Sequence, residues 1–204
     1  MIKLNVTSLS KQFGSNRVFT NLSFSANAGI LGIAGSNGSG KSTLLKCISG
    51  LMKPSSGEAE WIVNGHITNK QDLKQVLGFA APYIQLYEEL TVTENLQFIT
   101  DIKKNSGSEN AAELLDEFGA GKFADSHFGE LSTGQQQRAK LAAALIHKPR
   151  ILLLDEPGSN LDKKGRGIIE EIVERFRNEN GFVLLASNQT YELDLCDRVI
   201  DLQP

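Results

Sequence analysis

The sequence predicts an α/β fold with a mostly parallel sheet that helices cover on both faces. Short apolar strands alternate with helical patterns along most of the 204 residues. The run from Ile151 to Leu154 is apolar at every position, which is typical of a central parallel strand. A glycine-rich segment, residues 35–43, lies between an apolar stretch and a helical pattern. The length favours one domain, or one large lobe with a smaller insertion.

Composition excludes several classes of protein. With 40% hydrophobic and 22% charged residues and a formal net charge of −3, the chain shows no general basic face for nucleic acid. Cys47 and Cys196 fit neither a disulfide framework nor a metal site, so we expect two buried thiols in a reducing compartment. No apolar run approaches the roughly 20 residues that span a bilayer, and residues 1–9 alternate like a strand rather than a secretory signal.

The first third of the chain is predicted to be rich in strands. Short apolar stretches broken by Gly and Asn predict strands at residues 2–6, at 18–24 and in the run that ends at Ile33. Apolar residues at helical spacing then predict a helix over residues 41–51, and residues 58–64 suggest another strand. The polar stretch that follows has no clear pattern.

From residue 91 the pattern becomes helical. Thr91 and Glu94 have the spacing of a capping box and predict that a helix begins there. Residues 105–110 are typical of a loop, and residues 111–118 of a short helix. We expect about residues 88–130 to form a helical insertion in the α/β core.

The last third alternates again between helices and strands. Ser132 and Thr133 are candidate N-caps for a helix that runs to His147 and stops before Pro149. Beyond the apolar strand, the pattern predicts a helix over residues 162–177 and closing strands at 182–186 and 199–202.

Residues 35–43 read GSNGSGKST, a complete G-x-x-x-x-G-K-[ST] phosphate-binding motif. Its glycines let the backbone curl so that N–H groups face phosphate oxygens, and the following helix N-terminus favours the anion. Lys41 is expected to bridge the terminal phosphates, and the Ser42 hydroxyl to ligate Mg²⁺. The predicted phosphate-binding residues are Gly35, Ser36, Asn37, Gly38, Ser39, Gly40, Lys41, Ser42 and Thr43.

Two carboxylates, Asp155 and Glu156, follow the apolar strand directly. Ligands bind at the carboxyl ends of strands in α/β sheets, so this pair is expected to face the phosphate loop. Asp155 is predicted to orient the Mg²⁺ shell, and Glu156 to polarise the water that attacks the γ-phosphate. Solvated surface acids are the alternative, which the complete phosphate loop disfavours.

Residues 131–138 read LSTGQQQR and resemble the signature LSGGQ of ATP-binding-cassette (ABC) ATPases. The order of phosphate loop, helical insertion, signature and acidic strand is also that family's order. The resemblance implies a P-loop NTPase core with a mixed or parallel sheet, an N-terminal antiparallel β subdomain and a helical insertion subdomain. It implies that ATP and Mg²⁺ bind, and that Ser132, Gly134 and Gln135 contact nucleotide held by a second subunit.

Two shorter matches support the resemblance. Residues 159–162 (SNLD) resemble the family's D-loop, which crosses the dimer interface. Phe13 falls where the family carries an aromatic residue that stacks on adenine, and its ring retains the π-face that stacking needs. A place in the hydrophobic core is the alternative for Phe13.

Three positions depart from the family's pattern. Thr133 replaces a signature glycine. Pro82 falls where the family has the Q-loop glutamine, and a proline side chain cannot ligate Mg²⁺. Gln85, three residues later, is a candidate Mg²⁺ contact, with an exposed loop residue as the alternative. Asn188 replaces a histidine that contacts the γ-phosphate; it can donate a neutral hydrogen bond but has no proton to relay. We therefore assign catalysis to Glu156, Lys41 and Asn188.

The resemblance implies that this chain is the ATPase subunit of an ABC transporter. Such a subunit pairs with itself or with a paralogous ATPase subunit, and the pair binds integral membrane transporter subunits. Such a chain is cytoplasmic and peripheral on the cytoplasmic face of the membrane. Residues 78–89 are expected to dock a membrane chain. The departures look somewhat like the small ATPases of haem exporters in cytochrome c biogenesis. The alternatives are a soluble ABC-type ATPase acting on ribosomes or DNA, although no nucleic acid partner is expected, and an ATP-dependent clamp with little turnover.

Overall fold

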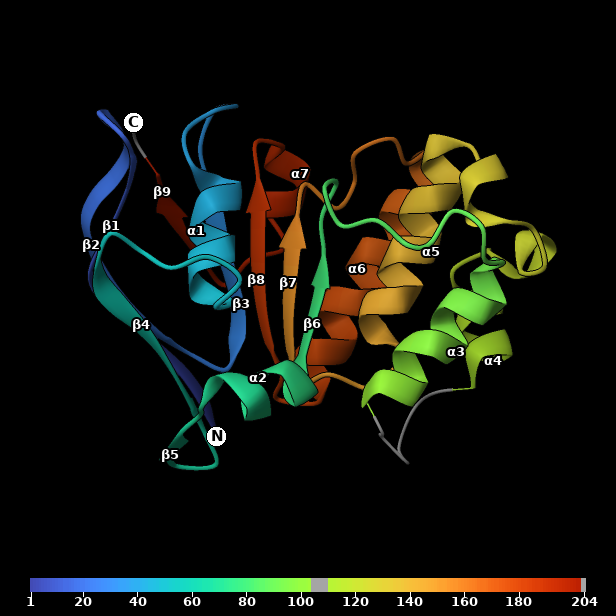
Figure 1. The fold of residues 1–204 in the computed structure, drawn as a ribbon, viewed down its shortest axis with the longest axis horizontal. Coiled ribbons are helices and arrows are strands. Elements are labelled where there is room, and N and C mark those ends of the chain that lie inside the picture. The colour runs from blue at the N-terminus through green and yellow to red at the C-terminus, as the bar shows by residue number, and fades with distance from the viewer. Residues whose placement is uncertain (104–109, 203–204) are drawn as a thin grey trace.

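The computed structural model describes residues 1–103 and 110–202, and Figure 1 shows a twisted antiparallel sheet beside a parallel one. The antiparallel sheet has the strand order β2-β1-β4-β5, and the parallel sheet has the order β6-β7-β8-β3-β9. Helix α1 lies between the two sheets, and the other long helices cover the opposite face of the parallel sheet. The predicted α/β class is confirmed.

The antiparallel sheet is formed by the first part of the chain, as predicted. Its strands are β1 (Ile2–Phe13), β2 (Asn16–Asn27), β4 (Ser56–Val63) and β5 (His66–Ile67). β1 and β2 form a hairpin whose strands are longer than predicted, because polar residues continue the pairing after the apolar stretches end. β1 also pairs antiparallel with β4, so it is a central strand of its sheet.

The parallel sheet carries the predicted central strand. Its members are β3 (Gly29–Ala34), β6 (Leu77–Ala80), β7 (Ile151–Asp155), β8 (Phe182–Ser187) and β9 (Arg198–Asp201). β7 pairs with β6 on one side and β8 on the other, and all five of its residues are buried. A strand with covered faces and two paired edges needs apolar side chains at every position, which explains its sequence.

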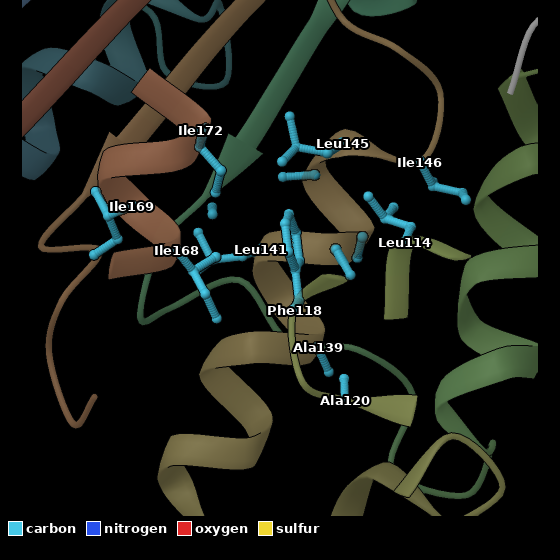
Figure 2. Close-up of a cluster of buried hydrophobic side chains, with 14 of the residues drawn as sticks. Leu114, Phe118, Ala120, Ala139, Leu141, Leu145, Ile146, Ile168, Ile169 and Ile172 are labelled. Carbon is cyan, nitrogen blue, oxygen red and sulfur yellow. The ribbon is translucent and has the colours of Figure 1, made fainter. Parts of the chain in front are cut away.

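Successive residues of β7 belong to different hydrophobic clusters because side chains alternate along a strand. Ile151 and Leu153 pack in the cluster that joins α1 to the antiparallel sheet. Leu152 and Leu154 pack in the cluster on the other face, with the helices shown in Figure 2. That second cluster contains residues of α4, α5 and α6 packed against one another.

Two of the helices begin at capping signals that the sequence predicts, at Thr91 and at Ser132. Thr91 Oγ1 accepts a hydrogen bond from Glu94 N at 3.1 Å, and Glu94 Oε2 accepts one from Thr91 N at 2.8 Å, which confirms the predicted capping box. The helices are α1 (Lys41–Ile48), α2 (Lys70–Val76), α3 (Val92–Lys103), α4 (Ala111–Glu117), α5 (Thr133–Leu145), α6 (Lys163–Asn178) and α7 (Thr190–Leu193), with 3-10 turns at Gly121–Phe123 and Phe128–Glu130.

Several predicted boundaries differ from the observed ones. The first helix ends at Ile48 instead of residue 51, because Gly50 has a φ of 75° and Leu51 is exposed. The predicted cap Thr133 is the first helical residue, and Ser132 is the N-cap. Residues 104–109, most of the predicted loop over 105–110, lie outside the described residues, while Asn110 caps α4. The insertion over residues 88–130 stays a prediction.

The elements between residues 65 and 80, and the short helix α7, were not predicted. α2 buries only Leu73 and so shows almost no apolar periodicity; its start is decided by Asn69, which accepts hydrogen bonds from the N–H groups of Gln71 and Asp72. β6 is four residues long and is held in place by pairing with β7. Neither has a sequence pattern long enough to detect.

Trp61 joins the two sheets through packing. Its indole Nε1–H donates to Ile48 O at 3.0 Å, and its ring meets Phe182 edge-on with centroids 5.0 Å apart. Both cysteines are free; Cys47 is buried as predicted, but Cys196 is only partly buried. Over the described ranges, the helices are too short or too polar for any of them to span a lipid bilayer.

A buried histidine makes the stability of this fold sensitive to acid. The His147 side chain lies 3.1 Å from Leu77 O through Nε2 and is 2% exposed. Burial lowers the pKa of His147, the positive charge of Lys103 adds to this effect, and the contact with Leu77 O opposes both, so that the resulting pKa is about 4.

Between pH 6.5 and 4 the unfolded chain binds a proton that the folded chain excludes, so the free energy of unfolding should fall as pH falls. The contribution of one group is at most about 1.4 kcal/mol per pH unit. Urea unfolding of wild type and of His147→Gln at several pH values measures it. The variant should show a shallower slope in this window, and parallel slopes would contradict the assignment.

Candidate active site

The predicted phosphate loop joins β3 to α1, and its backbone has the curled shape that such a loop requires. Gly38 and Gly40 have φ angles of 85° and 101°, a region that residues with a Cβ rarely adopt. The Lys41 ammonium group folds back over the loop and donates to Gly35 O at 2.7 Å and Ser36 O at 3.1 Å. The loop is therefore closed by its own lysine.

Lys41 also connects the loop to the acidic pair. Its Nζ lies 3.2 Å from Glu156 Oε1, and the lysine side chain is only 6% exposed. Glu156 has a φ of 48°, in the left-handed region, which costs a residue with a Cβ about 1–2 kcal/mol. Strain of this kind is retained where surrounding structure holds the residue in place. The predicted general base thus faces the predicted phosphate-binding lysine.

Asp155 provides a carboxylate that could ligate a cation. It is 1% exposed, and neither carboxylate oxygen accepts a well-directed hydrogen bond within the described part of the chain, although the Ser42 and Tyr83 hydroxyls lie near it. Burial raises the pKa of Asp155, while Ser42 and the positive charges of Lys41 and Lys46 oppose this rise. A buried carboxylate oxygen beside a hydroxyl suits Mg²⁺, which binds through few protein ligands and keeps phosphate and water in its shell.

No group of three or more His, Cys, Asp or Glu side chains is placed to hold a metal ion in residues 1–103 and 110–202. The Asp155–Ser42 arrangement fits a cation that arrives together with phosphate oxygens.

Asn188 reaches the phosphate loop from the end of β8. Its Nδ2 donates to Asn37 Oδ1 at 2.9 Å, and its Oδ1 accepts from Gln189 Nε2 at 2.9 Å. The predicted replacement for the histidine therefore lies at the loop, with its amide already engaged in neutral hydrogen bonds.

A cavity of about 470 Å³ is lined by the phosphate loop, Lys41 and Glu156, whereas Asp155 and Asn188 are not part of its lining. Phe13 is at its edge, 50% exposed, with the Lys11 ammonium 4.8 Å from its ring centroid. The alternative of a core position for Phe13 is therefore wrong. The lining residues are Phe13, Asn16, Val18, Asn37, Gly38, Gly40, Lys41, Ser42, Thr43 and Glu156.

The predicted signature residues do not line this cavity. Ser132 caps α5 by accepting from Gln135 N at 3.4 Å, and Gln135 Oε1 accepts from Ser132 N at 2.9 Å. Gly134 lies close to Asn160 O, where a Cβ would approach to 2.9 Å. In Figure 1 the start of α5 and the phosphate loop lie at the same edge of the molecule, on either side of β7 and β8.

The structure does not bring Gln85 to the cavity. Gln85 is exposed and absent from the lining, so the exposed-loop interpretation fits its position. Tyr83 takes a place near Asp155 instead, and the Lys46 ammonium lies 3.6 Å from its ring centroid. Burial raises the pKa of Tyr83, and the charge of Asp155 adds to this effect. No motif in the sequence marks Tyr83.

Comparison with known proteins identifies related chains. The family model described as "ABC transporter" matches residues 19–159. YbhF of Escherichia coli (strain K12), described as a probable multidrug ABC transporter ATP-binding protein, is 35% identical over 84% of this chain and 30% of its own length. The histidine/lysine/arginine/ornithine transport ATP-binding protein HisP of the same organism is 34% identical over 92% of this chain and 80% of its own.

The share of each relative that this chain matches varies widely. The uncharacterized ABC transporter ATP-binding protein YdbJ of Bacillus subtilis (strain 168) is 33% identical over 98% of this chain and 66% of its own length. The chain thus spans less than a third of YbhF and about two thirds of YdbJ.

Solved structures share the whole fold. The dimeric structure of MJ0796, a bacterial ABC transporter cassette, has a TM-score of 0.85 and 25% identity over 97% of this chain and 93% of its own. A second MJ0796 structure, a post-hydrolysis state bound to ADP and Pi, has a TM-score of 0.84. These likenesses confirm the predicted cassette fold.

Two glycines of the loop allow a matched test of its geometry. A Cβ at Gly40 would lie 2.5 Å from Val18 Cγ1, whereas a Cβ at Gly38 would meet no heavy atom within 4 Å. Gly38→Ala should lower the free energy of unfolding by about 1–2 kcal/mol through the positive φ alone. Gly40→Ala should lower it by about 1–3 kcal/mol more, because overpacking is added. Urea unfolding compares the two, and equal losses would contradict this loop geometry.

Proposed function

Because this chain belongs to the ABC transporter family, we propose that it is the ATP-binding and ATP-hydrolysing subunit that drives a membrane transporter. One observation carries this proposal. A single cavity brings together the phosphate-loop lysine, a hydroxyl beside a buried Asp155, and the strained Glu156. The names of YbhF and HisP, both transporter ATP-binding proteins, support the same function.

In the proposed mechanism, the N–H groups of the phosphate loop bind the β- and γ-phosphates of ATP. Lys41 then exchanges its contacts with Gly35 O and Ser36 O for phosphate oxygens and stabilises the charge that develops on them. Glu156 is freed from Lys41 by this exchange and accepts the proton of the attacking water. Glu156 thus neutralises the Lys41 charge that phosphate oxygens neutralise when ATP is bound.

The remaining residues in or near the cavity bind and orient the nucleotide. Ser42 and Asp155 would hold Mg²⁺, which, when bound, supplies positive charge at the β- and γ-phosphates. The Asn188 amide donates to Asn37 and can donate to a phosphate oxygen instead, without a titrating proton. The half-exposed ring of Phe13 offers its face to adenine at the cavity edge.

We further propose that ATP is enclosed between two copies, or between this chain and a paralogous ATPase subunit. Ser132 and the N–H of Gly134 lie at the exposed start of α5, apart from the cavity of their own chain. A helix N-terminus attracts anions, so this end suits a γ-phosphate held by another subunit. The dimeric MJ0796 cassette supports this arrangement.

A membrane partner is expected at a second, largely apolar cavity. It measures about 250 Å³, and the predicted docking segment 78–89 contributes Phe79, Ile84 and Leu86 to its lining. A cytoplasmic location, peripheral to the membrane, follows from the proposed partner. The narrower likeness to haem exporters stays a prediction.

Replacing the proposed base tests catalysis. Glu156→Gln removes the proton acceptor but keeps the shape of the side chain, so ATP turnover should fall by about 100-fold or more while ATP binding persists. Glu170→Gln, an exposed change on α6, is the matched control and should be neutral. Negligible and equal turnover in wild type and Glu156→Gln, with binding intact, would favour the clamp with little turnover.

Replacing the α5 cap tests the shared site. In a Glu156→Gln background, which retains ATP, Ser132→Arg should prevent ATP-dependent dimerisation because its long side chain fills the anion-binding surface. Binding of ATP to the monomer should be unchanged. Light scattering measures the dimer, with Gln97→Arg on α3 as an exposed control. A normal dimer of the Ser132→Arg variant would refute the shared site.

A further inference from the structure

The turn that carries Glu156 is strained, and regular hydrogen bonding alone does not hold it. Glu156 and Asn160 have φ angles of 48° and 65° within five residues. Backbone bonds link Glu156 N to Ala186 O at 2.8 Å and Ser159 N to Glu156 O at 3.1 Å. A further backbone bond joins Leu161 N to Gly158 O at 3.1 Å. These bonds leave Pro157 O and Gly158 N to other partners.

Two buried side chains supply those partners from opposite sides. Glu192 Oε1, from α7, accepts a hydrogen bond from Gly158 N at 2.7 Å. Gln137 Nε2, from α5, donates to Pro157 O at 2.9 Å. Glu192 is 1% exposed and Gln137 is 5% exposed. The residues that directly follow Glu156 are therefore held between α7 and α5.

The fit around Gly158 is close. A Cβ on Gly158 would lie 2.3 Å from Glu192 Oε1 and 2.0 Å from the Tyr191 hydroxyl, so no larger residue fits without a shift. The Tyr191 hydroxyl also donates to Glu192 Oε1, at 3.0 Å. Glu192 is thereby aimed at one backbone amide.

Glu192 is an expensive residue to bury for packing alone. It forms no ion pair within the described ranges, and its Oε2 accepts no well-directed hydrogen bond there, although the Ser187 hydroxyl lies near the carboxylate. Burying a carboxyl group with so few partners is unfavourable, and an apolar residue of similar size would suit a core site better. What Glu192 contributes is a strong acceptor for Gly158 N, two residues after the proposed base.

We propose that Glu192 is a positioning residue for Glu156: by accepting from Gly158 N, it holds the strained turn so that the Glu156 carboxylate faces Lys41 and the cavity. This inference rests on the proposed function. Glu192 lies outside the cavity lining and touches no reacting atom. Since a misplacement of about 1 Å can cost about 100-fold in rate, the loss of one distant acceptor is enough to reduce turnover.

The test compares two replacements of Glu192. Glu192→Gln keeps an oxygen that accepts from Gly158 N, whereas Glu192→Leu keeps a similar volume without an acceptor. For ATP hydrolysis, Glu192→Leu should lower kcat by about 100-fold with KM changed less than about threefold, and Glu192→Gln should retain kcat within about fivefold. Ile168→Val, a buried change on α6, is the control for loss of stability alone, and its kcat should be unchanged.

A second readout does not depend on turnover. In amide-resolved NMR of the nucleotide-free chain, Gly158 N–H should exchange slowly in wild type and Glu192→Gln, and quickly in Glu192→Leu. The amide signal of Glu156 should move in Glu192→Leu alone. If wild type hydrolyses no ATP, the proposed function fails, while these signals still decide whether Glu192 positions the turn.

Three results would overturn the inference. One is normal kcat in Glu192→Leu. Another is equal loss of kcat in both replacements, which would assign the effect to charge instead of the acceptor. The third is Gly158 and Glu156 amide signals in Glu192→Leu that match those of wild type.

Discussion

The carboxyl ends of β3, β7 and β8 meet at one edge of the parallel sheet, and the site depends on that alignment. β8 pairs in parallel with both β3 and β7, so the segments that follow these strands leave on the same side. They carry the phosphate loop, the acidic pair and Asn188. The 3.2 Å contact between Lys41 and Glu156 exists because the strands before them share one neighbour and one direction.

The cost of burying charge explains why the site is prepared for a ligand. Lys41 is compensated by two carbonyl oxygens and one carboxylate. Asp155 is buried equally deeply, but receives no well-directed hydrogen bond among the residues described. Burying an ionised group is costly unless the group is paired, because burial removes its hydration. A cation that binds together with phosphate oxygens would compensate the Asp155 carboxylate for this lost hydration.

The departures from the family's pattern concentrate around this edge. Asn188 bonds to Asn37 of the phosphate loop, so the loop and the end of β8 are joined by neutral amides without a titrating group. Pro82 contributes its carbonyl to the buried Lys140 at 3.1 Å, and the neighbouring Tyr83 lies near Asp155. The segment that was expected to supply Gln85 to the metal therefore supplies an aromatic hydroxyl near the carboxylate, and Gln85 is exposed.

The sequence by itself determined the elements whose residues must satisfy a local rule. The positive φ angles at positions 38 and 40 require glycine. Helix caps require the spacing of Thr91 and Glu94 and that of Ser132 and Gln135. Burial on both faces requires the unbroken apolar run of β7. These rules act over a few residues and can be detected in one chain. They were sufficient to predict the α/β class, the phosphate loop and the acidic pair at the end of β7.

Only the tertiary structure decided what depends on neighbours distant in sequence. β6 forms because it pairs with the edge of β7. α2 forms because Asn69 caps its start, although the helix buries only Leu73. Tyr83 near Asp155, and Glu192 and Gln137 around the turn after Glu156, are contacts between separate elements and leave no periodic pattern in the sequence. Their hydrogen bonds and burial arise from the packing of α5, α7 and the strand ends, which is a property of the folded chain.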